Sequence, residues 1–221
     1  GKGVSVAGEH FCFFNQPAAA EANYQMFWAS LRPLLAGNTD ALAQLDALRE
    51  GFAAAMQQQL EAMWASKLGL AHYDPELVND LLELMVRSSV DYTILFRRLS
   101  AIPADIAPIK ASFYRPSTDQ LDQRWTQWLQ RWRDRLMANG NLSETSAAMQ
   151  RVNPAITWRE WLIAPAYQQA AQGDMRLIAE LQQVFSTPYA DLPAELASIY
   201  DRLKPQEFFG AGGVSHYSCS S

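Results

Sequence analysis

Histidine and cysteine are scarce in this chain, and their scarcity excludes several classes of site. Among 221 residues there are three histidines, His10, His72 and His216, and two cysteines, Cys12 and Cys219. Two cysteines near opposite ends fit neither a four-ligand zinc site nor a disulfide-dense secreted scaffold. We therefore expect a reducing compartment. The chain is expected in the cytoplasm if it is bacterial and in the mitochondrion if it is eukaryotic.

An excess of positive charge and long apolar runs are also missing. The 18 basic residues are outnumbered by 23 acidic ones, giving a formal charge of −5. A nucleic-acid binder that relies on a strongly basic surface is therefore not expected. No uncharged apolar run reaches the ~18 residues of a membrane span. Residues 1–8 do not form a convincing signal peptide, because Glu9 and His10 follow before an adequate apolar segment develops.

What the sequence does contain is helical periodicity along almost its whole length. With 49% hydrophobic residues, the chain can bury a substantial core, and no stretch alternates long enough to predict a strand. We predict an all-α fold, with a helical domain over residues 18–209 between a short segment 1–17 and a flexible Gly/Ser tail 210–221. The helices are expected at about 18–35, 40–68, from 75 onward, 91–99, 119–138, from 143, 153–173, 174–185 and 193–203. Residues 102–116, with three prolines, are expected to be irregular.

Two helix boundaries are predicted from capping residues. Asp74 followed by Pro75 favours a helix start, because Asp accepts from free backbone amides and Pro gives up an amide without a partner. Asn153 followed by Pro154 is interpreted in the same way, as the cap of a helix ending at Gly173. Pro165 is expected to bend or divide that helix.

A stripe of tryptophans is the most conspicuous aromatic feature. Trp125, Trp128 and Trp132 recur at intervals of three and four residues and are interleaved with arginines. Base stacking on a cationic face is one interpretation. Core packing is favoured, because the spacing is that of a buried helical face, with the arginines at its edges.

Candidate chemical groups are few. The carboxylates of Glu61, Glu76, Asp80, Glu83 and Asp91 are spread as expected for solvated helix faces, and nothing pairs two of them for acid–base work. Cys219 and His216 lie three residues apart in the tail. They suggest a reactive thiol, but an ordinary exposed tail is favoured, since no basic cluster is there to lower the pKa of the thiol.

Several segments, in order, resemble the selenoprotein O family, kinase-like proteins sometimes described as pseudokinases. The first is residues 11–17, which end in Asn15-Gln16-Pro17. The second is Asp91-Tyr92-Thr93 with Phe96, Arg97 and Leu99. The third covers residues 149–174, including Asn153-Pro154, Arg159, Trp161-Leu162 and Gly173-Asp174, and continues to Pro188-Tyr189. The last is Ser218-Cys219-Ser220-Ser221.

The resemblance implies transfer of AMP from ATP to Ser, Thr or Tyr side chains of target proteins, with Mg²⁺ or Mn²⁺. This chain would correspond to the later C-lobe and C-terminal helices of the kinase-like protein. The family's nucleotide-binding and metal-binding residues lie before its Asn-Gln-Pro segment, and residues 1–8 depart from the pattern expected there. We therefore assign no catalytic, cofactor-binding or metal-binding residue to this chain, and expect it to be inactive without an N-terminal kinase-like half.

The resemblance also implies a redox role for Cys219, whose family counterpart is thought to join a cysteine near the activation segment. The position of that partner is expected upstream of this chain, and Cys12 is a candidate to substitute for it. A buried structural role for Cys12 is favoured, because phenylalanines surround it. The alternative functions are a non-catalytic helical interaction or redox-regulatory module, and an unrelated helical hydrolase with a cleft of convergent polar groups.

Overall fold

The structure, a computed structural model, describes residues 16–209. All regular elements within this range are helices, and the one β-bridge joins Val90 to Phe113. The predicted all-α class is therefore confirmed. Most of the predicted segment 1–17 and all of the tail 210–221 lie outside the described residues, so these two boundaries stay predictions. The chain divides after Met63 into two compact units, which are taken separately below.

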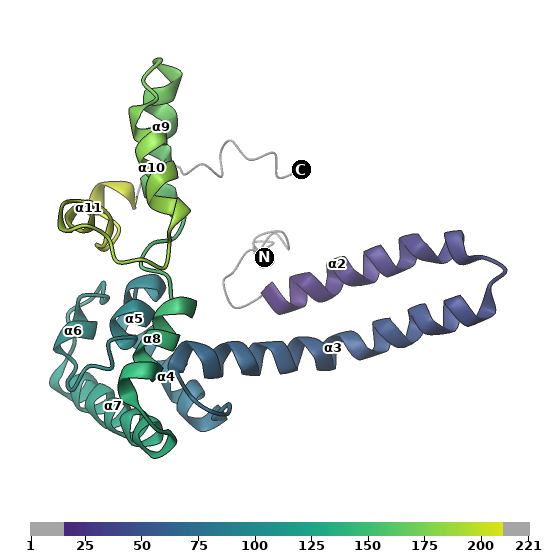
Figure 1. The fold of residues 1–221 in the computed structure, drawn as a ribbon, viewed down its shortest axis with the longest axis horizontal. Helices are drawn as coiled ribbons and strands as arrows, with labels where there is room; N and C mark the ends of the chain where they lie inside the picture. Colours follow the sequence, from purple (N-terminus) through teal and green to yellow (C-terminus); the bar gives the residue numbers. More distant parts are fainter. Residues whose placement is uncertain (1–15, 210–221) are drawn as a thin grey trace, which may run out of the picture. The chain divides into compact units, whose positions relative to one another are not determined.

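The first unit contains a helical hairpin. Helix α2 (Gln16–Leu31) is followed by a 3₁₀ turn (Arg32–Leu35) and by α3 (Thr39–Leu68), which runs back antiparallel to α2 (Figure 1). The α-helix ends at Leu31, four residues before the predicted end, since Pro33 lacks an N–H and crowds the preceding turn. Asn38 Oδ1 accepts from the Ala41 amide at 3.0 Å and so caps α3.

The second unit begins in the last turn of α3 and contains two hydrophobic clusters. The first cluster is built from the end of α3 and from five further helices. These are α4 (Pro75–Ser88), α5 (Tyr92–Leu99), α6 (Ala107–Lys110), α7 (Asp119–Asn139) and α8 (Leu142–Val152). Asp74 caps α4 as predicted, with Leu77 N 3.0 Å from Asp74 Oδ1.

The tryptophan stripe of α7 lies at the centre of this first cluster. Trp125, Trp128 and Trp132 are fully buried, which confirms the prediction of core packing. Each indole N–H is satisfied at 2.8 Å: Trp128 donates to Leu77 O and Trp132 to Leu68 O, while Trp125 donates to the Ser88 hydroxyl. These three bonds tie α7 to α4 and to the end of α3 without leaving a buried donor unpaired.

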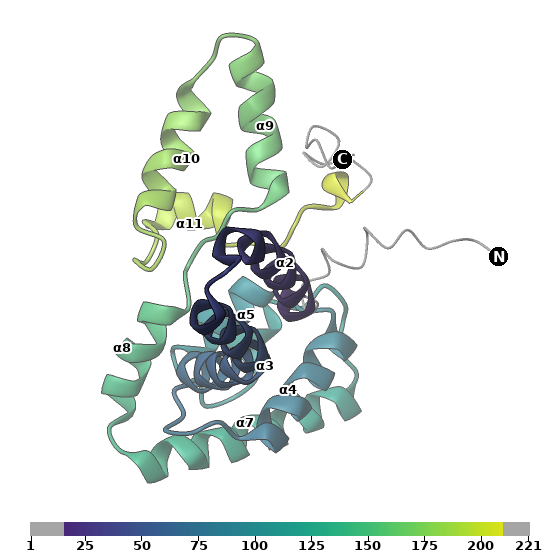
Figure 2. The same ribbon diagram turned by 90° about the vertical axis from the view of Figure 1, so that its right-hand side faces the viewer.

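The second cluster is smaller and forms around an antiparallel helix pair. Helices α9 (Glu160–Ala171) and α10 (Arg176–Ser186) lie side by side in Figure 2. Helix α11 (Ala194–Tyr200) and a 3₁₀ turn (Gln206–Phe208) contribute to the same cluster. Pro165 lies inside α9 without dividing it. Asp174 Oδ1 accepts from the Arg176 amide at 3.0 Å, at the start of α10.

The predicted cap at Asn153 is wrong. Asn153 ends α8, and the next helix starts only at Glu160. Pro154 disfavours helical dihedrals at the residue before it, and Asn153 is extended at φ −110° and ψ 100°. Its side chain is fully buried and bonds within the first cluster, so it is not available to cap a helix.

Candidate functional site

Two of the segments that carry the family resemblance, 91–99 and 149–174, meet in the second unit. The start of α5 and the connection between α8 and α9 are more than 50 residues apart in sequence, yet side chains of one bond to the other. We call this meeting point, formed by Asp91, Arg97, Asn153 and Arg159, the motif junction. It connects an element of the first hydrophobic cluster to the segment that leads into the second.

Asp91 and Arg159 form a buried ion pair at the motif junction. Arg159 Nη2 lies 3.0 Å from Asp91 Oδ1, and the side chains are 11% and 10% exposed. The same Asp91 oxygen caps α5 by accepting from Ile94 N at 3.0 Å, and Asp91 Oδ2 accepts from the Tyr114 hydroxyl. The carboxylate is thus satisfied by three donors from separate elements, which offsets part of its desolvation. The prediction that Asp91 lies on a solvated face is wrong.

Arg97 makes the second connection of the motif junction. Its Nη1 donates to two backbone carbonyls, Gln150 O at 3.2 Å and Asn153 O at 3.1 Å, while Nη2 pairs with Asp191. Carbonyls at the end of α8 lack helical partners, so a guanidinium there satisfies them and fixes the exit of the chain. The Thr93 and Thr157 hydroxyls also share a hydrogen bond of 3.1 Å.

Asn153 extends the junction into the core through Lys67. Lys67 Nζ donates to Asn153 Oδ1 at 2.8 Å, and Asn153 Nδ2 donates to Lys67 O at 2.8 Å and to Ser100 Oγ at 3.0 Å. The ammonium lies over the rings of Tyr92 and Phe96, 4.9 and 4.5 Å from their centroids. Burial lowers the pKa of Lys67 from 10.5 to about 8 and raises the pKa of Tyr92.

This arrangement suits positioning and offers little for bond-breaking chemistry. Each polar side chain of the motif junction is bonded to other side chains or to backbone, and none is a nucleophile aligned with a base. Within residues 16–209, no three His, Cys, Asp or Glu side chains lie close enough to hold a metal ion. The sequence offered no signal for Lys67 or Ser100, because each is a single polar residue whose partners are distant in the chain.

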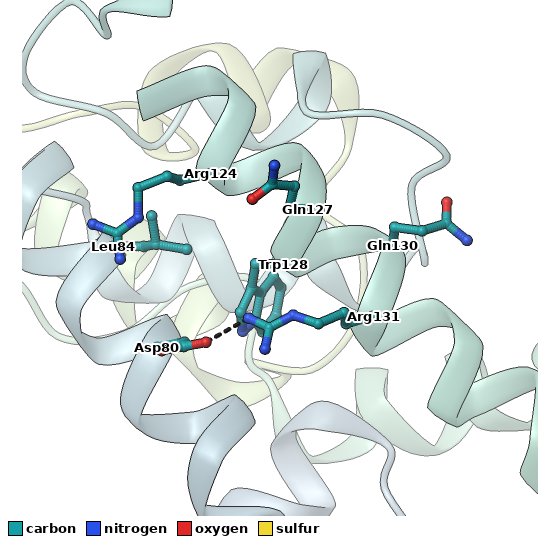
Figure 3. Close-up of a pocket in the computed structure, with 7 residues that line it drawn as sticks. All are labelled: Asp80, Leu84, Arg124, Gln127, Trp128, Gln130 and Arg131. Carbon is teal, nitrogen blue, oxygen red and sulfur yellow. Dashed lines mark hydrogen bonds and ion pairs between the residues drawn. The ribbon is translucent and has the colours of Figure 1, made fainter. Parts of the chain in front are cut away.

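A separate polar groove lies between α4 and α7. Its volume is about 560 Å³, and its lining includes Asp80, Arg124, Trp128 and Arg131 (Figure 3). Arg131 pairs with Asp80, and Arg124 forms two bonds to Glu83 at 3.0 and 3.1 Å. Both guanidiniums already face carboxylates, so the groove presents no free cationic pair to a phosphate. The arginines do lie at the edge of the tryptophan stripe, as predicted.

The two cysteines predicted as redox candidates, Cys12 and Cys219, lie outside the described residues, as do His10 and His216. Their proposed redox role therefore stays a prediction. No described helix is both long enough and apolar enough to cross a membrane.

Comparison with known proteins identifies the family. A family model described as protein adenylyltransferase SelO matches residues 6–186. This chain belongs to the SelO family. The match includes the hairpin of the first unit, the whole motif junction and helices α9 and α10. The segments recognised from sequence therefore lie within one continuous family region, except for Pro188-Tyr189 and the C-terminal motif at 218–221.

Curated relatives of this SelO-family chain carry the name protein nucleotidyltransferase YdiU. The protein of Tolumonas auensis is 32% identical over 226 residues, which cover 99% of this chain and 42% of the relative. A Bradyrhizobium protein is 35% identical, covering 83% of this chain and 38% of the relative. The Myxococcus xanthus protein is 34% identical, with coverage of 83% and 37%. The chain thus spans about two fifths of the length of these relatives.

Proposed function

We propose that this chain is the helical C-terminal portion of a SelO-type protein nucleotidyltransferase. The complete enzyme would transfer AMP from ATP to Ser, Thr or Tyr hydroxyls of target proteins. The observation that carries the proposal is the family match over residues 6–186, which extends across both units. The portion would correspond to the later C-lobe and C-terminal helices of a kinase-like fold.

The groups that bind ATP and its divalent metal are proposed to lie in sequence beyond this chain. Relatives named nucleotidyltransferases have more than half of their length outside the aligned region. A magnesium–ATP site needs oxygen ligands for the ion and unpaired cations for the phosphates. Arginines beside the described cavities, such as Arg98 and Arg131, are paired with carboxylates.

The role proposed for the described helices is mechanical. Nucleotidyl transfer depends on holding the nucleotide and the acceptor in line, so rigid support contributes to the rate without touching the substrate. The motif junction supplies such rigidity, because it fastens the first cluster to the segment entering the second with buried, fully bonded polar groups.

An AMP-transfer assay tests this proposal. The full-length Tolumonas auensis relative, given Mg²⁺ and ATP labelled on the α-phosphate, should label protein, whereas label on the γ-phosphate should not appear. The isolated 221-residue chain should label nothing under the same conditions and should not bind ATP. Transfer of the γ-phosphate by the relative would contradict the proposed reaction. Micromolar ATP binding by the isolated chain would contradict the proposal that the ATP-binding groups lie beyond this chain.

A further inference from the structure

The helical hairpin of α2 and α3 contains little buried core. Among residues 17–63, whose exposure the structure describes, Leu45 alone is buried. The seam between the helices is held by a Tyr24–Phe52 ring stack at 4.4 Å and by the Trp28 indole donating to Asp46 at 3.1 Å. Two helices joined by so few contacts are marginal alone, because most helical stability in proteins comes from packing an apolar face.

Large apolar groups are exposed on this hairpin, and helix α2 and residues 51–60 of α3 are poor in charge, whereas residues 40–50 carry Asp40, Asp46, Arg49 and Glu50. Met26, Phe27, Leu34 and Leu48 are 73%, 58%, 79% and 64% exposed. Helix α2 carries one charged residue, Glu21, and residues 51–60 of α3 carry none. A surface facing water is normally about a quarter to a third charged. Depletion of charge together with exposed Met and Phe is instead typical of the centre of an interface.

We propose that this exposed surface of the α2–α3 hairpin is a docking surface for the remainder of the full-length SelO polypeptide, meeting an uncharged, apolar face there. The inference rests on the proposed function, in which that remainder exists. The hairpin lies inside the region matched by the family model, and the Tolumonas auensis relative pairs 99% of this chain with additional sequence making up more than half of its length. The hairpin is thus part of the family region, and in the relative it occurs together with this additional sequence.

A partner on the same polypeptide is favoured over a second copy of the chain. Tethering raises the effective concentration of the two surfaces to about the millimolar range, so a modest apolar contact suffices. A second copy would have to supply the whole cost of association from the same surface.

Hydrogen exchange on two unaltered proteins provides the first test. In the isolated chain, amides of α2 should exchange at least about tenfold faster than those of α7, because they open locally without packing. In the full-length Tolumonas auensis protein, the peptides aligned with α2 and α7 should be protected alike. The inference is overturned if α2 is already as protected as α7 in the isolated monomer. Fast exchange of the aligned peptide in the full-length protein would also overturn it.

Sedimentation at several concentrations, measured on the same isolated chain, tests the second copy as occupant. The chain should remain monomeric and α2 should remain fast-exchanging throughout. If α2 becomes protected in step with formation of a dimer, a second copy covers the surface and the inference is wrong.

A matched pair of substitutions then locates the contact. Phe27→Glu and Val86→Glu each place a charge at an exposed apolar helix position, with native exposures of 58% and 70%. In a chimera where this chain replaces the aligned part of the Tolumonas auensis protein, Phe27→Glu should abolish the protection of α2 while Val86→Glu leaves it intact. Equal effects of the two would contradict the inference. Loss of AMP transfer with unchanged protection would count against the proposed function alone.

Discussion

Arg159 reaches back from the start of α9 to Asp91 at the start of α5, placing guanidinium Nη2 3.0 Å from carboxylate Oδ1 with both side chains about nine-tenths buried. Arg159 Nη1 also donates to Arg202 O at 3.1 Å, so the same side chain contacts the segment after α11. One arginine therefore holds α5, the entry to α9 and the chain following α11 in register.

Removing Arg159 should destabilise the second unit strongly. Arg159→Ala leaves the Asp91 carboxylate buried without its cation, and breaking such a pair costs about 3–5 kcal/mol. Urea unfolding followed by tryptophan fluorescence measures the loss. Arg176→Ala is the matched control, because Arg176 also pairs with an aspartate, Asp174, but is 90% exposed. An exposed pair is screened by water and salt and contributes little, so similar losses for the two variants would contradict a structural role for the motif junction.

Stability should rise between about pH 8 and pH 10 because of Lys67. Burial lowers the pKa of Lys67 from 10.5 to about 8 in the folded chain. In this window the unfolded chain binds a proton at Lys67 that the folded chain releases, so raising the pH favours folding. One pKa unit corresponds to about 1.4 kcal/mol, which sets the full gain at about 3 kcal/mol. Above pH 10 the raised pKa of Tyr92 acts in the opposite direction.

The contribution of Lys67 is isolated by subtraction. The free energy of unfolding is measured from pH 7 to pH 10 for the native chain and for Lys67→Met, which keeps an unbranched stem against Phe96 and Tyr92. As the pH rises, the free energy of unfolding of the native chain should increase relative to that of Lys67→Met. Parallel curves would show that the Lys67 ammonium is not desolvated by its neighbours.

Most of the helical architecture follows from local sequence signals. Asp74 before Pro75 predicted the start of α4, and the three-and-four spacing of Trp125, Trp128 and Trp132 predicted the buried face of α7. These predictions succeed because a cap and an apolar stripe act within one or two turns of their own helix. The 102–116 segment was expected to be irregular, and it contains only the single turn of α6.

The motif junction could be recognised by resemblance but not built from the sequence. Asp91 was assigned to a solvated face and Asn153 to a helix start, because single-sequence patterns report local caps and not partners more than 50 residues away. The burial of both depends on tertiary contacts with Arg159 and Lys67. A polar residue with a distant partner looks, in sequence, the same as one bonded to water.

Replacing Ser89 with glycine should stabilise the chain slightly. Ser89 follows α4 in the left-handed conformation, at φ 48° and ψ 61°. That conformation costs an L-residue about 1–2 kcal/mol, whereas the greater freedom of glycine in the unfolded chain costs about 0.4–1 kcal/mol. The balance favours Ser89→Gly by about 0.5–1 kcal/mol in urea unfolding. A loss of stability would mean that the Ser89 side chain contributes more than the conformational relief.

Replacing Gly69 with alanine should be more costly than the same change at Gly173. Both glycines follow helices in the left-handed region, at φ 67° and 87°. A Cβ on Gly69 would lie 2.6 Å from Thr145 Cγ2 and 2.9 Å from Met149 Sδ, whereas one on Gly173 would meet nothing within 4 Å. Gly173→Ala therefore reports the conformational cost alone, about 1–2 kcal/mol. Gly69→Ala adds a clash with α8 worth about 1–3 kcal/mol. Thermal unfolding of the two variants measures the difference. Equal losses would mean that the side chains of Thr145 and Met149 on α8 move away from the added Cβ at no cost in stability.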